Sequence, residues 1–272
     1  MPISRRLITL FLVFLLSHPG FTQEKSIPKK FLADASQVVR GAKYVLTSPL
    51  RWQKKDWATF GAVAAGTVAL SLLDEPADNY LRRHSSRTAD KFREFGNEYG
   101  EPRTVIILTG GLYAVGLVAG SEWLRETCVI LSASMLASGI IQSTTKYAAG
   151  RARPRLGLGH AEFDPFRTEE LYYSFFSGHT MVAMTTSHVF AKRIHHMPAK
   201  IVLYSLGAIG SFARMYNRDH WSTDVALGNA LAIASVNSVS KWLVSKKEGK
   251  ERRGAQWQIT PRGRGVSLMA HW

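Results

Sequence analysis

The sequence CVILSASMLASGIIQSTT, residues 128–145, contains no charged residue, and KYAAGRARP, residues 146–154, follows it directly. An apolar stretch of this length is typical of a helix buried in a membrane or in a protein core. Lys146 and Arg153 stand just beyond its end, where charged groups are costly unless they are paired or bind an anion. The two stretches therefore predict a helix that carries an anion-binding group at one end.

Five further apolar stretches lie on either side of this one. They cover residues 57–73, 104–120, 180–191, 201–212 and 225–244. Small residues such as Gly61, Gly110, Gly139 and Gly228 recur in them, and small residues let helices approach closely inside a membrane. We expect an all-α fold in which six helices form one membrane bundle, with no repeats.

The chain is strongly basic, which indicates an anionic partner. Of its 272 residues, 35 are Lys or Arg and 20 are Asp or Glu, giving a net charge of +15. Nucleic acid, anionic lipid headgroups and phosphorylated substrates all fit such a charge. No long basic run has aromatic residues interleaved, which argues against nucleic acid. Cys128 is the single cysteine, so an intramolecular disulfide and a cysteine-based zinc site are both excluded.

The N-terminus reads as a targeting segment. Two basic residues precede the apolar residues 7–16, and Ser, His, Pro and Gly then break the pattern. Ten residues are too few to span ~30 Å of hydrocarbon as a helix. We interpret residues 1–22 as a signal peptide or an uncleaved N-terminal anchor. Residues 23–56 follow as a basic segment.

Charges in the connections predict an orientation. If the six stretches span a membrane, the segments 24–56, 121–127, 192–200 and 241–253 lie on one side, with eight, one, three and six Lys or Arg. The positive-inside rule makes this side cytoplasmic. The segments 74–103, 146–179 and 213–224 then face outward, to the periplasm in a bacterium. Cleavage of a signal peptide would reverse this arrangement, and the sequence leaves both alternatives open.

Three stretches on the predicted outer side concentrate reactive and cationic groups. The first is KYAAGRARP, residues 146–154, described above. The second is SFFSGHT, residues 174–180, and the third is ARMYNRDHWSTD, residues 213–224. A helix that begins at Ser177-Gly178-His179 would offer backbone N–H groups to an anion. If His220 and Asp224 lie on a helix, they share one face, and a carboxylate could orient the imidazole. Each feature alone is weak evidence, because isolated basic residues and His/Asp pairs are common at surfaces.

In combination, the three stretches resemble the signature of the PAP2 family, the type 2 phosphatidic acid phosphatases and their vanadium haloperoxidase relatives. Lys146 to Arg153-Pro154 matches the first part, and Ser177-Gly178-His179 the second, with Phe176 where proline is usual. Arg214, His220 and Asp224 match the third, with Ala213 in place of serine. The resemblance covers residues 57–244 and implies the helical bundle of the PAP2 and haloperoxidase type.

The resemblance also implies a mechanism without metal or cofactor. His220 attacks phosphorus and Asp224 orients it. His179 protonates the leaving oxygen and then activates water. The phosphate-binding residues would be Lys146, Arg153, Ser177, Gly178 and Arg214. Their cationic groups do the work that magnesium does in other phosphoryl-transfer enzymes.

Several functions remain open at this point. The first is hydrolysis of a lipid phosphate or pyrophosphate, such as phosphatidic acid, phosphatidylglycerol phosphate, undecaprenyl pyrophosphate or lipid A phosphate, in a membrane. The rivals are a periplasmic acid phosphatase acting on soluble esters and a vanadium-dependent haloperoxidase. A non-catalytic membrane binding protein or transporter is the alternative from another class.

Other conspicuous residues have structural interpretations. We expect Asp74-Glu75-Pro76 to cap a helix end, His195-His196 to be a solvated turn, and Arg151, Arg155 and Arg218 to contribute positive potential around the site. Residues 245–272 form a C-terminal tail. Its part from residue 256 alternates around Pro261 and two glycines, which indicates a short hairpin or an extended segment.

Overall fold

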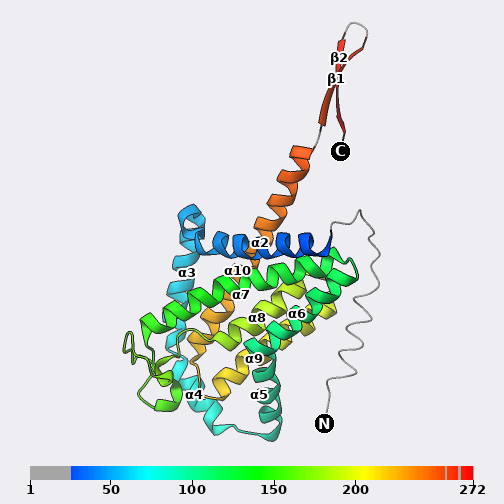
Figure 1. The fold of residues 1–272 in the computed structure, drawn as a ribbon. Coiled ribbons are helices and arrows are strands. Elements are labelled where there is room, and N and C mark those ends of the chain that lie inside the picture. The colour runs from blue at the N-terminus through cyan, green and yellow to red at the C-terminus, as the bar shows by residue number, and fades with distance from the viewer. Residues whose placement is uncertain (1–25, 255, 263–264, 272) are drawn as a thin grey trace.

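The computed structural model describes residues 26–254, 256–262 and 265–271, with side chains up to residue 248. Its described part holds nine α-helices followed by a β-hairpin (Figure 1). The helices are α2 (Ile27–Leu46), α3 (Lys54–Ser71), α4 (Asp74–Arg83), α5 (Arg87–Tyr99), α6 (Pro102–Val118), α7 (Glu122–Ala149), α8 (Gly178–Arg193), α9 (Met197–Tyr216) and α10 (Ser222–Gly254). Short 3₁₀ turns occupy Ser48–Arg51, Pro154–Leu156 and Glu170–Tyr172.

The prediction of an all-α bundle is confirmed, but the prediction of six helices is wrong. All six apolar stretches are helical, as α3 and α6 to α10. The three additional helices, α2, α4 and α5, lie in segments that we expected to be connections. Their apolar residues occupy one side only, so they form no continuous apolar run. Pro28 lies in the first turn of α2, and the Ser86 hydroxyl caps α5 by accepting from the Ala89 N–H at 3.1 Å.

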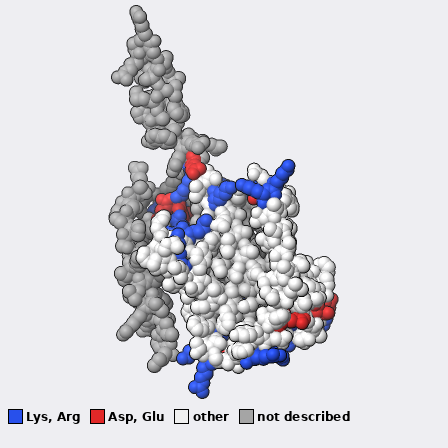
Figure 2. Space-filling view, turned by 180° about the vertical axis from the view of Figure 1, so that it is seen from behind, with Lys and Arg blue, Asp and Glu red and all other residues white. Residues whose placement is uncertain are grey.

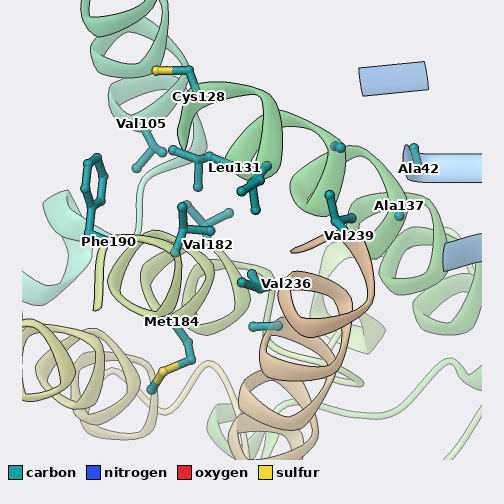
Figure 3. Packing of buried hydrophobic residues seen from close by; sticks show 14 of the residues in the cluster. Ala42, Val105, Cys128, Leu131, Ala137, Val182, Met184, Phe190, Val236 and Val239 are labelled. Carbon is teal, nitrogen blue, oxygen red and sulfur yellow. The ribbon is translucent and has the colours of Figure 1, made fainter. Parts of the chain in front are cut away.

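The core lies where α7, α8 and α10 meet, with α2 and α6 packed against α7. Figure 3 shows Leu131 and Ala137 of α7 pointing toward Val182 of α8 and toward Val236 and Val239 of α10. Where α10 passes the start of α8, a Cβ on Gly228 would lie 2.8 Å from the Ser177 carbonyl oxygen. Only glycine permits this approach, which brings the beginnings of two helices together.

Gly150 ends α7 and turns the chain into the loop that follows. It adopts φ +56°, and its N–H donates to the Lys146 carbonyl at 3.0 Å. A Cβ there would lie 1.7 Å from the Asp164 carbonyl oxygen, so any other residue would clash. This turn sets the position of Arg151 and Arg153, which follow the end of α7.

One helix of the described chain, α7, is long and apolar enough to cross a membrane. The pair α3 and α4 passes the same test together, although it bends by 49° at the break. Helix α6 is apolar but shorter.

The chain ends in an antiparallel hairpin of β1 (Gln256–Arg262) and β2 (Gly265–His271). Of the two alternatives for this tail, the hairpin is therefore the one observed. Figure 1 shows that the last turns of α10 carry it beyond the bundle. The predicted targeting segment, residues 1–22, lies outside the described residues.

Candidate active site

The three predicted stretches converge at one end of the bundle. Lys146 comes from the end of α7, His179 from the first turn of α8, Arg214 from the last turn of α9, and Asp224 from the first turn of α10. Backbone bonds join the stretches directly, because the Ser177 N–H donates to the Asp224 carbonyl at 3.1 Å. Residues more than 70 positions apart in sequence thus form one cluster.

His220 lies in the connection between α9 and α10 and is 3 % exposed. Its Nδ1 lies 2.6 Å from the Ser174 carbonyl oxygen, which can only accept, so Nδ1 carries the proton. Nε2 therefore holds a lone pair, and no described residue hydrogen-bonds it. Burial, and then the positive charges of Lys146 and two arginines, lowers the pKa of His220 well below its ordinary value of 6.5. The imidazole is neutral at pH 7, as a nucleophile must be.

Asp224 does not contact the His220 ring, contrary to our expectation. Helix α10 begins at Ser222, so His220 precedes the helix and the spacing of four does not place the two side chains on one face. Asp224 Oδ2 instead accepts from the Ser174 hydroxyl at 2.6 Å and from the Trp221 N–H at 3.0 Å. Asp224 therefore acts on His220 through Ser174, which bonds both of them.

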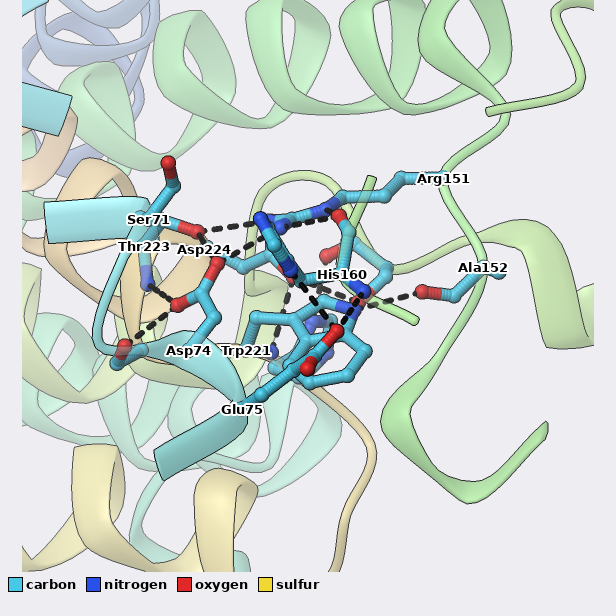
Figure 4. Close-up of polar contacts among 12 residues, drawn as sticks. Ser71, Asp74, Glu75, Arg151, Ala152, His160, Trp221, Thr223 and Asp224 are labelled. Atoms are coloured by element: carbon cyan, nitrogen blue, oxygen red, sulfur yellow. Dashed lines mark hydrogen bonds and ion pairs between the residues drawn. The ribbon is translucent and has the colours of Figure 1, made fainter. Parts of the chain in front are cut away.

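Arg151, which we expected to contribute positive potential around the site, is instead paired with two buried carboxylates. The residue is 3 % exposed, and its two terminal nitrogens reach Asp224 and Asp74, each at 2.7 Å. Figure 4 shows this guanidinium between the two carboxylates, with the carbonyl of His160 as a further acceptor. Asp74 also accepts from the Thr223 N–H at 2.9 Å. Asp74 belongs to α4 but caps the start of α10. The expected capping role is therefore found at a helix that is distant in sequence.

Arg153 and Arg214 lie on two sides of the Asp219 carboxylate. Asp219 Oδ1 is 3.1 Å from an Arg153 terminal nitrogen, and Oδ2 forms a short bond with Arg214. The arginines are 7 % and 9 % exposed, and the Nε–H of each is buried without a hydrogen-bond partner. Unpaired buried donors are costly. Two such donors on neighbouring cations indicate a place for oxygen atoms of an anion.

Lys146 and the start of α8 complete the cationic pocket. No described residue forms a hydrogen bond or ion pair with the Lys146 ammonium. The Ser177 hydroxyl caps α8 by accepting from the Thr180 N–H at 3.4 Å, so its proton is free to be donated. Gly178 opens the helix, whose first N–H groups favour an anion. Within the described chain, no group of three or more His, Cys, Asp or Glu is arranged to hold a metal ion.

His179 is paired with Glu101, a residue that the sequence analysis did not identify. Its Nε2 lies 3.1 Å from a carboxylate oxygen of Glu101, the residue that caps the start of α6. Burial lowers the pKa of His179, as do the charges of Arg214 and Lys146, whereas the Glu101 carboxylate opposes this shift and fixes the ring. The two residues are 78 positions apart, so no local motif could have revealed the contact.

The remaining predicted residues have partners of their own. Arg155 is half-exposed and lies 3.1 Å from Asp219, whereas Arg218 forms two bonds of 2.8 Å with Asp78. Phe176, which replaces the usual proline, is held by a hydrogen bond from the Gln142 amide to its carbonyl at 3.2 Å. Ala213 is fully buried where α9 packs against α5.

The comparisons with known proteins agree with this architecture. The solved structure of Aquifex aeolicus LpxE is similar at 17 % identity and a TM-score of 0.50, covering 62 % of this chain and 95 % of that one. A transmembrane PAP2 type phosphatidylglycerolphosphate phosphatase from Bacillus subtilis is similar at 16 % identity and a TM-score of 0.51, covering 70 % and 94 %. Among curated proteins, no sequence matches.

The family model that matches is the PAP2 superfamily, over residues 127–248. This range begins in α7 and extends into α10, so it contains all eight site residues predicted from the sequence. The motif residues, the fold and the family model agree, and residues 127–248 of this chain resemble the PAP2 superfamily.

Proposed function

We propose that this protein is a membrane phosphatase that hydrolyses a lipid phosphate or pyrophosphate through a phosphohistidine at His220. The observation that carries the proposal is the pair of buried, unpartnered Nε–H groups of Arg153 and Arg214 beside a neutral histidine. The charges of Lys146, Arg153 and Arg214 all act on His220, and we propose that they hold a phosphoryl group together with the start of α8. Such preorganised charge is the main source of catalysis in phosphoryl transfer.

The reaction has two steps. His220 Nε2 attacks phosphorus, a P–N bond forms, and the P–O bond to the leaving group breaks as His179 donates its proton to that oxygen. Water then attacks the phosphohistidine, His179 accepts a proton from it, and the P–N bond breaks to release phosphate. Lys146, Arg153 and Arg214 neutralise the phosphoryl oxygens in both steps.

A large apolar cavity supports a lipid as the substrate. It has a volume of about 910 Å³ and lies between α2, α6, α7 and α8. Lys146 and His179 line one end, and Cys128 lines the other. Eighteen residues of helix separate Cys128 from Lys146, which corresponds to roughly 27 Å. A hydrocarbon chain of a substrate bound at the cationic pocket could occupy this cavity.

The distribution of charge supports a membrane location. Figure 2 shows one face of the molecule on which charged residues gather toward two opposite ends, with a broad uncharged band between them. Exposed apolar residues are numerous, among them Val68, Ile106 and Ile107. We propose several membrane passes, with the basic segments near α2 and the end of α10 on the cytoplasmic side. The catalytic site would then face outward, to the periplasm in a bacterial cell.

The test is phosphate release by detergent-purified protein in the presence of EDTA. The substrates are phosphatidic acid, phosphatidylglycerol phosphate, lipid A phosphate, an isoprenyl pyrophosphate and a soluble aryl phosphate. We expect release from one of the lipids to survive EDTA and to exceed release from the aryl ester. Folded protein that releases phosphate from none of them would rule out the phosphatase.

Changing Glu101 to Gln should lower kcat for the lipid substrate about 10- to 100-fold. The amide removes the charge that stabilises protonated His179, and acid–base help of this type contributes ~10²–10⁴-fold. Glu98→Gln is the matched control, because Glu98 lies at the end of α5, three residues before Glu101, and its carboxylate bonds only the Thr104 hydroxyl, at 2.7 Å. Equal rates for the two variants would exclude a role for Glu101 in catalysis.

Changing Gly139 to Leu should lower the activity on lipid substrates without lowering the activity on a soluble ester. Gly139 lines the cavity, and a Cβ there would meet no atom within 4 Å, so the larger side chain fills the cavity without a clash. We expect kcat/KM for the lipid to fall about tenfold, which corresponds to about two displaced methylene groups at ~0.8 kcal/mol each. The aryl phosphate rate should not change.

Gly111→Leu is the control for this substitution. Gly111 is also a helical glycine with open space around it, but it does not line the cavity. An equal loss in both variants, or an equal loss for both substrates, would show that the cavity does not hold the lipid chain.

A further inference from the structure

The Asp219 carboxylate is bound by two of the three cations that we assign to phosphate binding. Its side chain is only 10 % exposed, and it directly precedes His220 in the sequence. One oxygen lies 3.1 Å from a terminal nitrogen of Arg153, and the other is bonded to Arg214. The same carboxylate therefore connects both arginines that we assign to phosphate.

Carboxylate and phosphate oxygens compete for the same faces of a guanidinium group. A bidentate anion binds two N–H groups of one guanidinium in parallel. In Arg153 and Arg214, Asp219 takes a terminal nitrogen of each, while the Nε–H of each has no partner. While Asp219 keeps both contacts, it takes donors from both arginines and places a negative charge beside any anion that binds their free Nε–H groups.

Arg155 provides an alternative partner for the same carboxylate. One of its terminal nitrogens lies 3.1 Å from Asp219 Oδ1, and its side chain is 40 % exposed at the edge of the pocket. Asp219 can keep this contact when it releases the two buried arginines. The charge would then remain paired, and the movement would involve only the side chain.

We propose that Asp219 is an internal competitor for the phosphate position, which pairs with Arg153 and Arg214 in the free enzyme and moves to Arg155 when a phosphoryl group binds. The inference rests on the proposed function. Its consequence is weak inhibition by inorganic phosphate. Displacing Asp219 costs the same free energy for a free phosphate ion as for a lipid phosphate, so both bind more weakly by the same factor. The lipid phosphate gains further binding energy from its hydrocarbon chain and therefore still binds, whereas free phosphate has only its own contacts.

The test compares Asp219→Asn with the wild type, using orthovanadate and inorganic phosphate as inhibitors of aryl phosphate hydrolysis. Asparagine keeps the shape of the side chain and removes its charge. We expect both inhibition constants to fall about tenfold or more in the variant. Unchanged or higher inhibition constants in folded Asp219→Asn would overturn the proposal, because Asp219 would then only hold the arginines in place.

Glu170→Gln is the matched control. Glu170 also contacts Arg153, at 3.2 Å, but its side chain is 76 % exposed and lies outside the buried pocket. Its removal should change the inhibition constants less than threefold. An effect as large as that of Asp219→Asn would mean that general charge, and not displacement of a buried carboxylate, controls phosphate affinity.

An experimental structure of the wild type with orthovanadate gives a second test, which does not depend on a variant that folds. We expect Asp219 to contact Arg155 and to have left Arg153 and Arg214. Vanadate bound while Asp219 keeps both contacts would overturn the inference but leave the phosphatase intact. A wild type that neither hydrolyses the aryl ester nor binds vanadate would instead remove the proposed function itself.

Discussion

Replacement of His220 by Ala should reduce phosphate release at least about 10⁴-fold. Removal of a nucleophile from a preorganised site generally has an effect of this size, and the residual rate comes from the remaining binding groups. The enzyme should also lose the ability to form an acid-labile phosphoryl adduct when it is mixed briefly with labelled substrate. The two readouts together test the covalent step, because a merely positioning histidine would leave the adduct detectable.

His195→Ala is the control for this experiment. His195 lies in the exposed connection between α8 and α9, and it should tolerate the change without loss of rate. Circular dichroism and gel filtration in detergent would establish that both variants are folded. A folded His220→Ala enzyme with more than a tenth of the wild-type rate would contradict the phosphohistidine mechanism.

The largest effect on stability is expected for Asp74→Ala. The carboxylate is fully buried and accepts hydrogen bonds from Arg151, from the Thr223 N–H and hydroxyl, and from the Ser222 hydroxyl. Its removal leaves the Arg151 guanidinium buried with one carboxylate fewer and the start of α10 uncapped. Breaking a buried pair from one side costs about 3–5 kcal/mol.

Thermal unfolding in detergent measures this prediction. For a domain of this size, 1 kcal/mol corresponds to roughly 2–4 °C, so we expect an apparent Tm about 10 °C lower. Glu75→Ala, at the next position, should change it by no more than ~2 °C, since Glu75 is half-exposed and bonds only His160. Similar Tm values for the two variants would mean that the buried network does not stabilise the fold.

The sequence predicted those features that depend on local composition. The six predicted apolar stretches all lie in helices. They were recognisable because a long uncharged stretch must be buried by protein or lipid. The helices α2, α4 and α5 were missed because the apolar residues of each lie on one side only, and packing against a partner surface makes these helices stable. The His220 to Asp224 spacing misled us for a related reason: it has meaning only if a helix includes both residues, and α10 begins between them.

The motif residues were correctly brought together, whereas their partners were not foreseen. Glu101 and Ser174 contact His179 and His220 across 78 and 46 positions of chain, and no spacing rule connects such positions. Asp219 is the exception. It adjoins His220, and an acidic residue between an arginine and a histidine of a cationic motif could have been recognised as a competing anion.

The contacts of Asp74 have a consequence for how the chain is made. Its partners Arg151 and Thr223 follow it by 77 and 149 residues. During synthesis, α3 and α4 therefore emerge long before the groups that neutralise this carboxylate exist. Until α10 has formed, Asp74 lacks these partners and must remain hydrated. The formation of α10 thus completes the network, and a nascent chain that is interrupted before this helix lacks both Thr223 and Asp224.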